Sequence, residues 1–340
     1  DSLKVLIKHI TLGLFSVLLL NGNAQDIHFS QYDLSPINLN PAMTGQFNGD
    51  FRFIGNYRSQ WGSVTVPFNT ISIGADAKNI FNTKDLAGGI QINQDRAGDS
   101  QFNTFQVNFS GAYLKPISND SLHNLSFGIQ TGFTNRSLTY NPLSFDVQYN
   151  GSYYDENLPN QENFARESRT YLNLNLGVGY LWEKERRKTI RGGLALFNLT
   201  KPKQSFFNDD VIKLDMRLAV HANAEWKVHE KINVLPSMLF MRQGKYKELD
   251  FGVSAKYILT DFMTMYRTVW LGLFYRNQDA GFLTAGMDYD QWKVGVSYDI
   301  NISTLVPASN NRGGLEVSVI YIIDNTPPKR IMHRICPDYI

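Results

Sequence analysis

The sequence predicts an all-β fold, namely an antiparallel transmembrane β-barrel of about 14 strands. Three observations lead to this prediction. Apolar and polar residues alternate with a period of two along most of the chain, as they do when successive side chains point to opposite faces of a strand. The alternating runs are longer than the strands of soluble sheets usually are. Aromatic residues reach 13% of the chain, which suits the aromatic girdles of membrane barrels.

Residues 213–228 form the clearest of these runs. Its even positions are all apolar, whereas most of its odd positions are polar or charged. An α-helix with 3.6 residues per turn would place Lys213, Arg217 and Glu225 on the same side as several apolar residues, so a helix is excluded. A transmembrane barrel strand needs about 9 to 11 residues of such alternation, whereas the usual strand has about 5 to 6. The run therefore predicts a strand with one face toward lipid.

Length and composition are compatible with a single membrane domain. The 340 residues fit one barrel, and the 43% of hydrophobic residues do not argue against a membrane because a barrel turns its polar residues inward. The formal net charge of +2 argues against a polyanionic partner, so no binding to nucleic acid is expected. Cys336 is the single cysteine, which excludes an internal disulfide.

The N-terminus predicts a signal peptide over residues 1–24. Lys4 and Lys8 precede the apolar residues 10–20, and small residues at 22–24 provide a cleavage site. The alternative is an N-terminal anchor helix, although the apolar run is too short to span a bilayer. Residues 25–50 are rich in Asn, Pro and Gly and lack alternation, so they predict an irregular segment that lies either in the lumen or in the periplasm.

Alternation then continues through residues 51–324, the predicted barrel, and residues 325–340 are expected to form a periplasmic C-terminal tail. Residues 231–242 are the weakest candidate strand, because Pro236 suggests a bulge or a strand end. The candidate strands are residues 51–58, 71–78, 86–93, 105–113, 125–134, 171–182, 189–199, 213–228, 231–242, 247–258, 268–276, 281–289, 292–302 and 313–323.

Loop lengths and tryptophans indicate how this barrel is oriented. If both termini are periplasmic, the connections after odd-numbered strands face outward and should be the longer ones. Most of them are, and residues 260–267 are a partial exception on the other rim. Trp182, Trp226 and Trp292 fall at one rim on the lipid-facing side, as interfacial indoles do, whereas the orientation of Trp270 is ambiguous. The long outward connections are residues 61–67, 94–100, 136–169, 200–212 and 303–312.

The predicted lumenal face carries charges of both signs. Such a lumen is either salt-bridged and plugged or a wet, weakly selective channel, and we favour the plugged alternative. The charged residues on this face are Arg52, Arg58, Asp76, Lys78, Arg217, Glu225, Lys256, Arg276, Lys293, Asp299 and Glu316.

Signs of catalytic or cofactor chemistry are weak. The six histidines lack metal-ligand spacing, and His221 is interpreted as a lumenal packing residue. Glycines at 177 and 179 lie within a strand and relieve crowding in the lumen rather than bind phosphate. Residues 95–99 form a turn, with calcium binding as the alternative. A lumenal hydrolase would need a triad that the sequence does not display, so no cofactor, metal or catalytic residue is predicted.

The loop at residues 136–169 combines aromatic residues with Asn and Ser, a composition typical of protein-binding surfaces. The alternative is a lid that packs over the barrel mouth. The candidate partner-binding residues are Tyr140, Phe145, Tyr149, Tyr153, Tyr154 and Phe164.

Several short motifs occur in a fixed order, and the first three are not explained by barrel composition alone. In this order, the chain resembles the PorP/SprF family of type IX secretion and gliding-motility proteins of Bacteroidetes. The motifs are His28-Phe29-Ser30-Gln31-Tyr32; Asn40-Pro41-Ala42 with Gly45; Tyr57-Arg58-Ser59-Gln60-Trp61 with Pro67; Ser126-Phe127-Gly128; Asn198-Leu199 with Pro202; Pro236-Ser237; Trp270-Leu271-Gly272; Tyr275-Arg276; Gly295-Val296-Ser297-Tyr298-Asp299; and Gly313-Gly314-Leu315-Glu316.

This resemblance implies a bacterial outer-membrane barrel without enzymatic activity. Its expected partners are outer-membrane lipid, other type IX components and a secreted adhesin that carries a type IX C-terminal signal domain. The favoured function is to bind, help export or tether that cell-surface adhesin. One alternative is a core PorP-like component that links the outer membrane to the periplasmic PorK/PorN ring, and another is a channel for a small solute.

Overall fold

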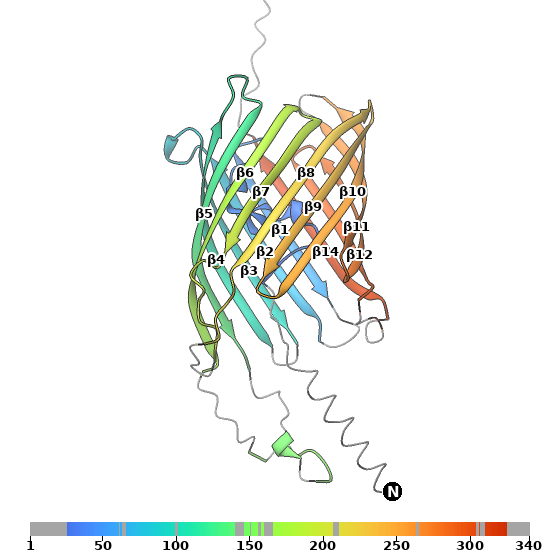
Figure 1. Ribbon diagram of the computed structural model, residues 1–340. Coiled ribbons are helices and arrows are strands. Elements are labelled where there is room, and N and C mark those ends of the chain that lie inside the picture. The colour runs from blue at the N-terminus through green and yellow to red at the C-terminus, as the bar shows by residue number, and fades with distance from the viewer. Residues whose placement is uncertain are drawn as a thin grey trace, which may run out of the picture.

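The computed structural model describes residues 26–324 except residues 61, 63–65, 99–100, 140–145, 150, 156–157, 160–165, 207–210, 263–264, 304–305 and 307–309. Fourteen antiparallel strands form a closed barrel in which each strand pairs with its neighbours in sequence (Figure 1). Pairing of the first strand with the last, with Phe51 opposite Ile323, closes the wall. Closure leaves no sheet edge with unpaired backbone groups, as a lipid environment requires. The predicted fold and strand number are confirmed.

The strands lie close to the predicted runs. Their bounds are β1 Phe51–Gln60, β2 Phe68–Lys78, β3 Leu86–Ala97, β4 Phe102–Pro116, β5 His123–Ser137, β6 Ser168–Glu185, β7 Lys188–Phe197, β8 Arg217–His229, β9 Ile232–Gln243, β10 Tyr246–Asp261, β11 Tyr266–Arg276, β12 Ala280–Tyr289, β13 Trp292–Asn301 and β14 Arg312–Ile323.

Alternation along each strand separates an apolar outer face from a polar lumen. On β13 the side chain of Val296 is 41% exposed on the outside, whereas that of Ser297 is 1% exposed inside. On β6 Leu172 faces out and Asn173 faces in. The buried interior of this barrel is therefore mainly polar, with its apolar side chains turned toward lipid, as in transmembrane barrels.

The barrel has two unlike rims. We call the rim at the ends of the odd-numbered strands the outer rim and the opposite one the inner rim. The longest connection, residues 138–167 between β5 and β6, extends from the outer rim, which points down in Figure 1. The loop-length prediction holds for the outer connections after β1, β5, β7 and β13. It is wrong after β3, where residues 98–101 rather than 94–100 join the strands in a short turn, and the outer connections after β9 and β11, residues 244–245 and 277–279, are short as well.

The predicted start of the clearest strand needs correction. β8 begins at Arg217 rather than at Lys213, and Leu214 is buried at 3% exposure instead of facing lipid. Lys213 forms an isolated bridge with Lys203, and the Leu214 amide donates to the Pro202 carbonyl at 2.9 Å. The chain thus folds back on itself before it enters the wall, a long-range contact that alternation cannot reveal.

Two further expectations about single residues are now settled. Pro236 neither ends β9 nor produces a bulge, since it stays in register opposite Val253 of β10. Trp270, whose orientation was ambiguous, faces the lumen and packs against a buried cluster around Leu34. The three tryptophans predicted to share a rim lie at the inner rim: Trp182 stacks on Trp226 with ring centroids 6.1 Å apart, and Trp292 is 48% exposed.

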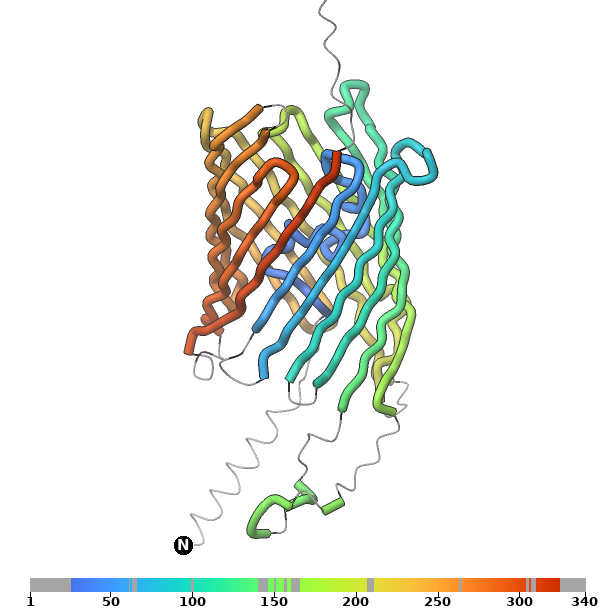
Figure 2. The backbone as a smooth tube through the Cα atoms, turned by 180° about the vertical axis from the view of Figure 1, so that it is seen from behind, coloured from blue at the N-terminus to red at the C-terminus, as the bar shows by residue number. Residues whose placement is uncertain are grey.

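Residues 26–50, which we call the plug, lie inside the barrel and contain three short helices, η1 Tyr32–Leu34, α2 Pro36–Leu39 and η2 Pro41–Met43 (Figure 2, blue). The plug runs from one rim to the other. Its first residue, Asp26, bonds to Gln243 and Asn198 near the outer rim, whereas the Asp50 amide donates to the Ile323 carbonyl at the inner rim. Of the two predicted locations for this irregular segment, the lumen and the periplasm, the structure shows the lumen. None of the helices in the described part of the chain has the length and apolar character that crossing a bilayer requires.

Because the apolar side chains face lipid, the cost of replacing one of them by a charged residue depends on how deep in the bilayer it lies. Leu271 is 62% exposed at the middle of the eleven-residue β11, and we expect Leu271→Arg to destabilise the protein by about 2–4 kcal/mol in lipid vesicles. Leu315 lies near the outer end of β14, so Leu315→Arg should cost only about 0–1 kcal/mol. Equilibrium unfolding in denaturant measures both values, and equal costs would contradict the assigned membrane position.

Candidate functional site

The first of the motifs, residues 28–32, is bound by charged side chains of the barrel wall. The backbone amides of Ser30 and Gln31 donate to the two oxygens of Glu316, each at 2.8 Å. The Ser30 hydroxyl donates to Asp299 at 3.0 Å. Phe29, Ser30, Gln31 and Tyr32 are all buried. The motif thus fits this site because the Glu316 carboxylate on β14 accepts from two consecutive amides, and the Asp299 carboxylate on β13 accepts from the Ser30 hydroxyl.

Two buried arginines complete the network. Arg276 on β11, which is 2% exposed, contacts Asp299 at 3.1 Å and Asp250 at 3.3 Å, and donates to the Ser30 hydroxyl oxygen at 2.8 Å. Arg58 on β1 donates to the His28 carbonyl at 2.6 Å and contacts Asp299 at 3.4 Å. Buried charges are tolerated when each has a partner and its hydrogen bonds are made. The network therefore joins the plug to strands on both sides of the barrel seam.

The second motif makes the turn in the middle of the plug. The Asn40 side-chain oxygen accepts from the Ala42 amide at 2.9 Å and caps η2, which begins at Pro41. The Asn40 amide nitrogen donates to the Val178 carbonyl at 3.0 Å and lies 3.2 Å from His221 Nε2. His221 is thus a lumenal packing residue, as predicted.

Glycines in the wall make room for this turn. A Cβ atom at Gly128 would lie 2.3 Å from the Ala42 amide nitrogen, and one at Gly177 would lie 2.0 Å from the Asn40 side-chain oxygen. Both distances are well inside van der Waals contact, so any side chain there would displace the plug. The glycine-rich stretches of β5 and β6 therefore relieve crowding in the lumen, as the sequence indicated, and specifically against the Asn40–Pro41 turn.

An ion pair fixes the plug at the inner rim. Arg52 on β1 contacts Asp76 on β2 at 2.7 Å and donates to the Met43 carbonyl at 3.0 Å. The Gly45 amide donates to the same Asp76 at 2.7 Å. The Arg52 guanidinium also stacks 4.7 Å above the ring of Phe47, a cation–π contact. The predicted lumenal charges are thus largely paired with each other and with plug backbone.

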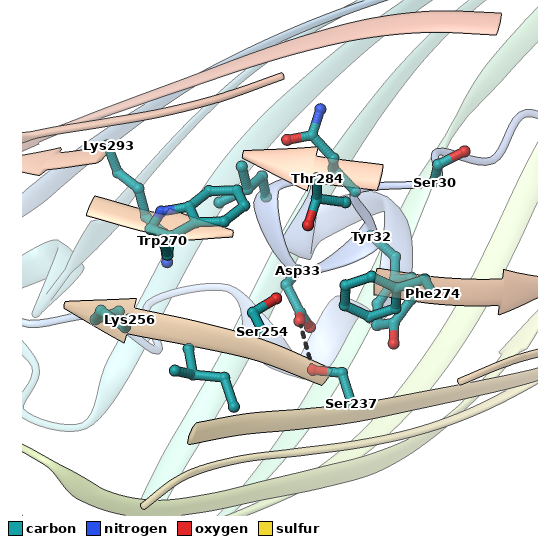
Figure 3. A pocket seen from close by; sticks show the side chains of 13 residues that line it. Ser30, Tyr32, Asp33, Ser237, Ser254, Lys256, Trp270, Phe274, Thr284 and Lys293 are labelled. Carbon is teal, nitrogen blue, oxygen red and sulfur yellow. Dashed lines mark hydrogen bonds between the residues drawn. The ribbon is translucent and has the colours of Figure 1, made fainter. Parts of the chain in front are cut away.

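A small cavity separates the plug from strands β9 to β13 on the other side of the lumen (Figure 3). Asp33 of η1 accepts from Ser237 at 3.1 Å and from Asn223 at 2.6 Å, and these bonds hold the plug at one edge of the cavity. The cavity has a volume of about 70 Å³, and Trp270 and Thr284 present buried polar atoms without a protein partner near it. A site of this size and polarity suits a few ordered waters.

The third motif is divided between two faces of β1. Arg58 points into the lumen, while Tyr57 is 41% exposed on the outer face. Ser59 and Gln60 are half-buried at the outer end of the strand, and Trp61 lies outside the described residues. Among the described residues of this motif, only Arg58 takes part in the network around Ser30. The sequence predicted that the partners Arg276, Asp299 and Glu316 face the lumen, but it did not predict that they bind the plug. The signal that could have indicated this contact is that all three residues belong to later motifs of the same family pattern.

The candidate partner-binding loop is described in part. Tyr149, Tyr153 and Tyr154 are 56%, 63% and 45% exposed, and Tyr149 pairs with Tyr154 in a short antiparallel bridge beyond the outer rim. η4, Asp146–Gln148, precedes the bridge. Tyr140, Phe145 and Phe164 lie outside the described residues. Within the described chain, no group of three or more His, Cys, Asp or Glu side chains is arranged to hold a metal ion. Asp99, part of the calcium alternative at residues 95–99, lies outside the described residues.

The comparison with known families explains the motif order. The model of the type IX secretion system membrane protein PorP/SprF matches residues 21–321. The chain belongs to this family. A PorP/SprF barrel with 14 strands and an apolar outer face lies in the bacterial outer membrane, as the sequence predicted. The family is a membrane component of a secretion system.

Solved structures share the barrel shape at low sequence identity. The CymD monoaromatic hydrocarbon channel is 9% identical with a TM-score of 0.48, and the match covers 89% of this chain and 95% of that chain. A FadL homologue from Pseudomonas aeruginosa is 10% identical with a TM-score of 0.40 and coverage of 83% and 92%. A TodX monoaromatic hydrocarbon channel mutant is 8% identical with a TM-score of 0.45 and coverage of 88% and 96%. No curated protein matches the chain.

Removing the central arginine of the network should release the plug. Arg276→Met would leave Asp250, Asp299 and the neighbouring carboxylates without their buried cation, which costs about 3–5 kcal/mol of unfolding free energy. The matched control is Arg267→Met, which breaks a partly exposed pair with Asp290 and should cost at most about 1 kcal/mol. Denaturant unfolding in lipid gives both numbers. Similar losses for the two variants would show that the network does not support the barrel.

A second pair of variants tests the fit of the turn. Gly128→Ala forces a methyl group onto the Ala42 amide and should destabilise by about 1–3 kcal/mol, with faster proteolysis of the plug. Gly55→Ala is the control, because its Cβ meets no atom within 4 Å. That variant should be neutral or slightly more stable, since alanine restricts the unfolded chain. Equal protease resistance of the plug in both variants would contradict the proposed close fit.

Proposed function

We propose that this PorP/SprF barrel binds, helps to export and tethers a secreted cell-surface adhesin, and that it does so without enzymatic activity. The observation that carries the proposal is the plug, which occupies the lumen from rim to rim and is hydrogen-bonded to two buried ion pairs of the wall, Arg276–Asp299 and Arg52–Asp76. A lumen filled in this way is a poor conduit for a solute. The loops of the outer rim then provide the surface on which an exported partner can bind.

The described part of the outer loop has the composition of a binding surface. Tyr149, Tyr153 and Tyr154 expose large, rigid side chains on a short bridged hairpin. Tyrosine contributes contact area at a low cost in side-chain entropy and is enriched in protein interfaces. These residues therefore support binding of an adhesin on the cell surface.

The inner rim supports a second candidate function. Phe81 in the β2–β3 turn is 87% exposed, and Ile117 in the β4–β5 turn is 55% exposed. Large apolar side chains on short periplasmic turns favour contact with a periplasmic partner. This is the arrangement expected of a core component that links the outer membrane to the PorK/PorN ring.

One experiment separates the two functions. The triple variant Tyr149→Ser, Tyr153→Ser and Tyr154→Ser is compared with Phe81→Ser in affinity purification from the native outer membrane, followed by mass spectrometry. We expect the triple variant to recover at least about tenfold less adhesin, as loss of aromatic interface residues does, and Phe81→Ser to recover the wild-type amount.

The opposite pattern would overturn the adhesin proposal in favour of the ring component. In that pattern, Phe81→Ser loses a periplasmic partner while the triple variant binds everything that the wild type binds. Heat-modified migration on gels provides the control for folding, because both sets of substitutions lie in exposed loops.

A further inference from the structure

The outer face of the barrel has a large hollow within its apolar belt. The hollow spans β7 to β11 and has a volume of about 690 Å³, in the range of about 300–1,000 Å³ that ligand sites occupy. Its base is formed by small outward residues, Ala222, Ala224 and Pro236, which expose the strand backbone beneath them. Larger apolar side chains border it, namely Ile190, Met238, Phe251, Val253, Leu273 and Tyr275.

The strand register shows how this groove lies in the membrane. Ile190 is the third residue of β7 from the inner rim and pairs with Ala224 of β8. Across β9 and β10, Pro236 pairs with Val253, and Val253 pairs with Leu273, which is the eighth residue of β11 from the inner rim. Because barrel strands are tilted by about 35–45°, this row of residues descends from the inner rim to a point past Leu271, the middle residue of β11. Ala224 and Pro236 lie in the half of β8 and β9 that is nearer the inner rim, so this part of the groove lies at the depth of an acyl chain of the inner leaflet.

The rim above the shallow end of the groove carries an excess of positive charge. Lys184 at the end of β6, Arg186 in the β6–β7 turn and Lys188 at the start of β7 lie there, together with Lys227 near the end of β8 and Lys231 in the β8–β9 turn. Glu185 pairs with Lys188 at 3.4 Å, Asp261 pairs with Arg186 at 3.6 Å, and Glu230 is the remaining acid of these turns. In the part of the chain that the structure describes, Lys184, Lys227 and Lys231 have no ion-pair partner. This sector is therefore suited to an anionic group at the membrane surface.

An aromatic pair joins the charged rim to the groove. Trp226 is 46% exposed on the outer face, pairs with Lys188 across β7 and β8, and stacks on Trp182 at 6.1 Å. Indole rings of this kind lie at the level of lipid headgroups. The order from rim to bilayer centre is thus cation, indole, apolar groove, which is the order of phosphate, glycerol and acyl chain in a phospholipid.

We propose that this face is a specific binding site for one anionic phospholipid of the inner leaflet. The phosphate lies against Lys188 and the neighbouring turn lysines, and one acyl chain fills the groove over Ala224 and Pro236. The charge on the rim and the descending course of the groove favour this occupant over a second copy of the chain, whose same rim also carries an excess of positive charge. The inference is independent of whether the outer loops bind an adhesin.

The test is native mass spectrometry of the full-length barrel in detergent micelles titrated with phosphatidylglycerol. We expect one tightly retained lipid per chain. Ala224→Phe fills the groove and should weaken retention at least tenfold. Ala75→Phe is the matched control, because Ala75 also faces outward, on β2 at the far side of the barrel, and should leave retention unchanged.

A charge variant tests the headgroup contact. Lys188→Gln should weaken phosphatidylglycerol binding about fivefold while leaving zwitterionic phosphatidylethanolamine unaffected. Equal retention in the Ala224→Phe and Ala75→Phe variants would overturn the site. So would equal affinity of the wild type for the two lipids, preferential retention of lipopolysaccharide, or a two-chain species that Ala224→Phe dissociates. Heat-modified gel migration verifies that each variant is folded.

Discussion

The barrel depends on one constraint. Its fourteen strands enclose a lumen that is too wide for their own side chains to fill, yet the buried polar groups of the wall need hydrogen-bond partners. The plug meets this requirement by supplying backbone amides and carbonyls to wall charges. Glu316 accepts from the amides of Ser30 and Gln31, Arg58 donates to the His28 carbonyl, and Arg52 donates to the Met43 carbonyl. Without the plug, these charges would face only one another or water.

The same constraint explains why the motifs are far apart in sequence and close in space. Ser30 lies beside Asp299 and Arg276, on strands that follow it by more than two hundred residues. Such residues form one site only when β14 closes against β1. A closed and plugged barrel leaves its two rims and its lipid face as the surfaces available to partners in the secretion system.

Much of the fold could be predicted from the sequence because period-two alternation is a local signal. It identified each strand, the lumenal position of charges such as Arg276, and the interfacial tryptophans at one rim. It failed where long-range contacts decide. Leu214 continues the alternation yet is buried, because its amide bonds to the Pro202 carbonyl before β8 begins. Pro236 remains within β9, in register opposite Val253. The location of residues 26–50 depends on pairing with distant carboxylates, which no local pattern contains.

The most direct test of the central claim is single-channel conductance in planar lipid bilayers, with the wild type compared to a variant that lacks plug residues 28–47. The plugged structure predicts little or no steady conductance for the wild type and a large, steady pore for the shortened variant. A wild-type protein that conducts as well as the shortened variant would show that residues 26–50 do not close the lumen, and the account of the motifs as plug contacts would fail with it.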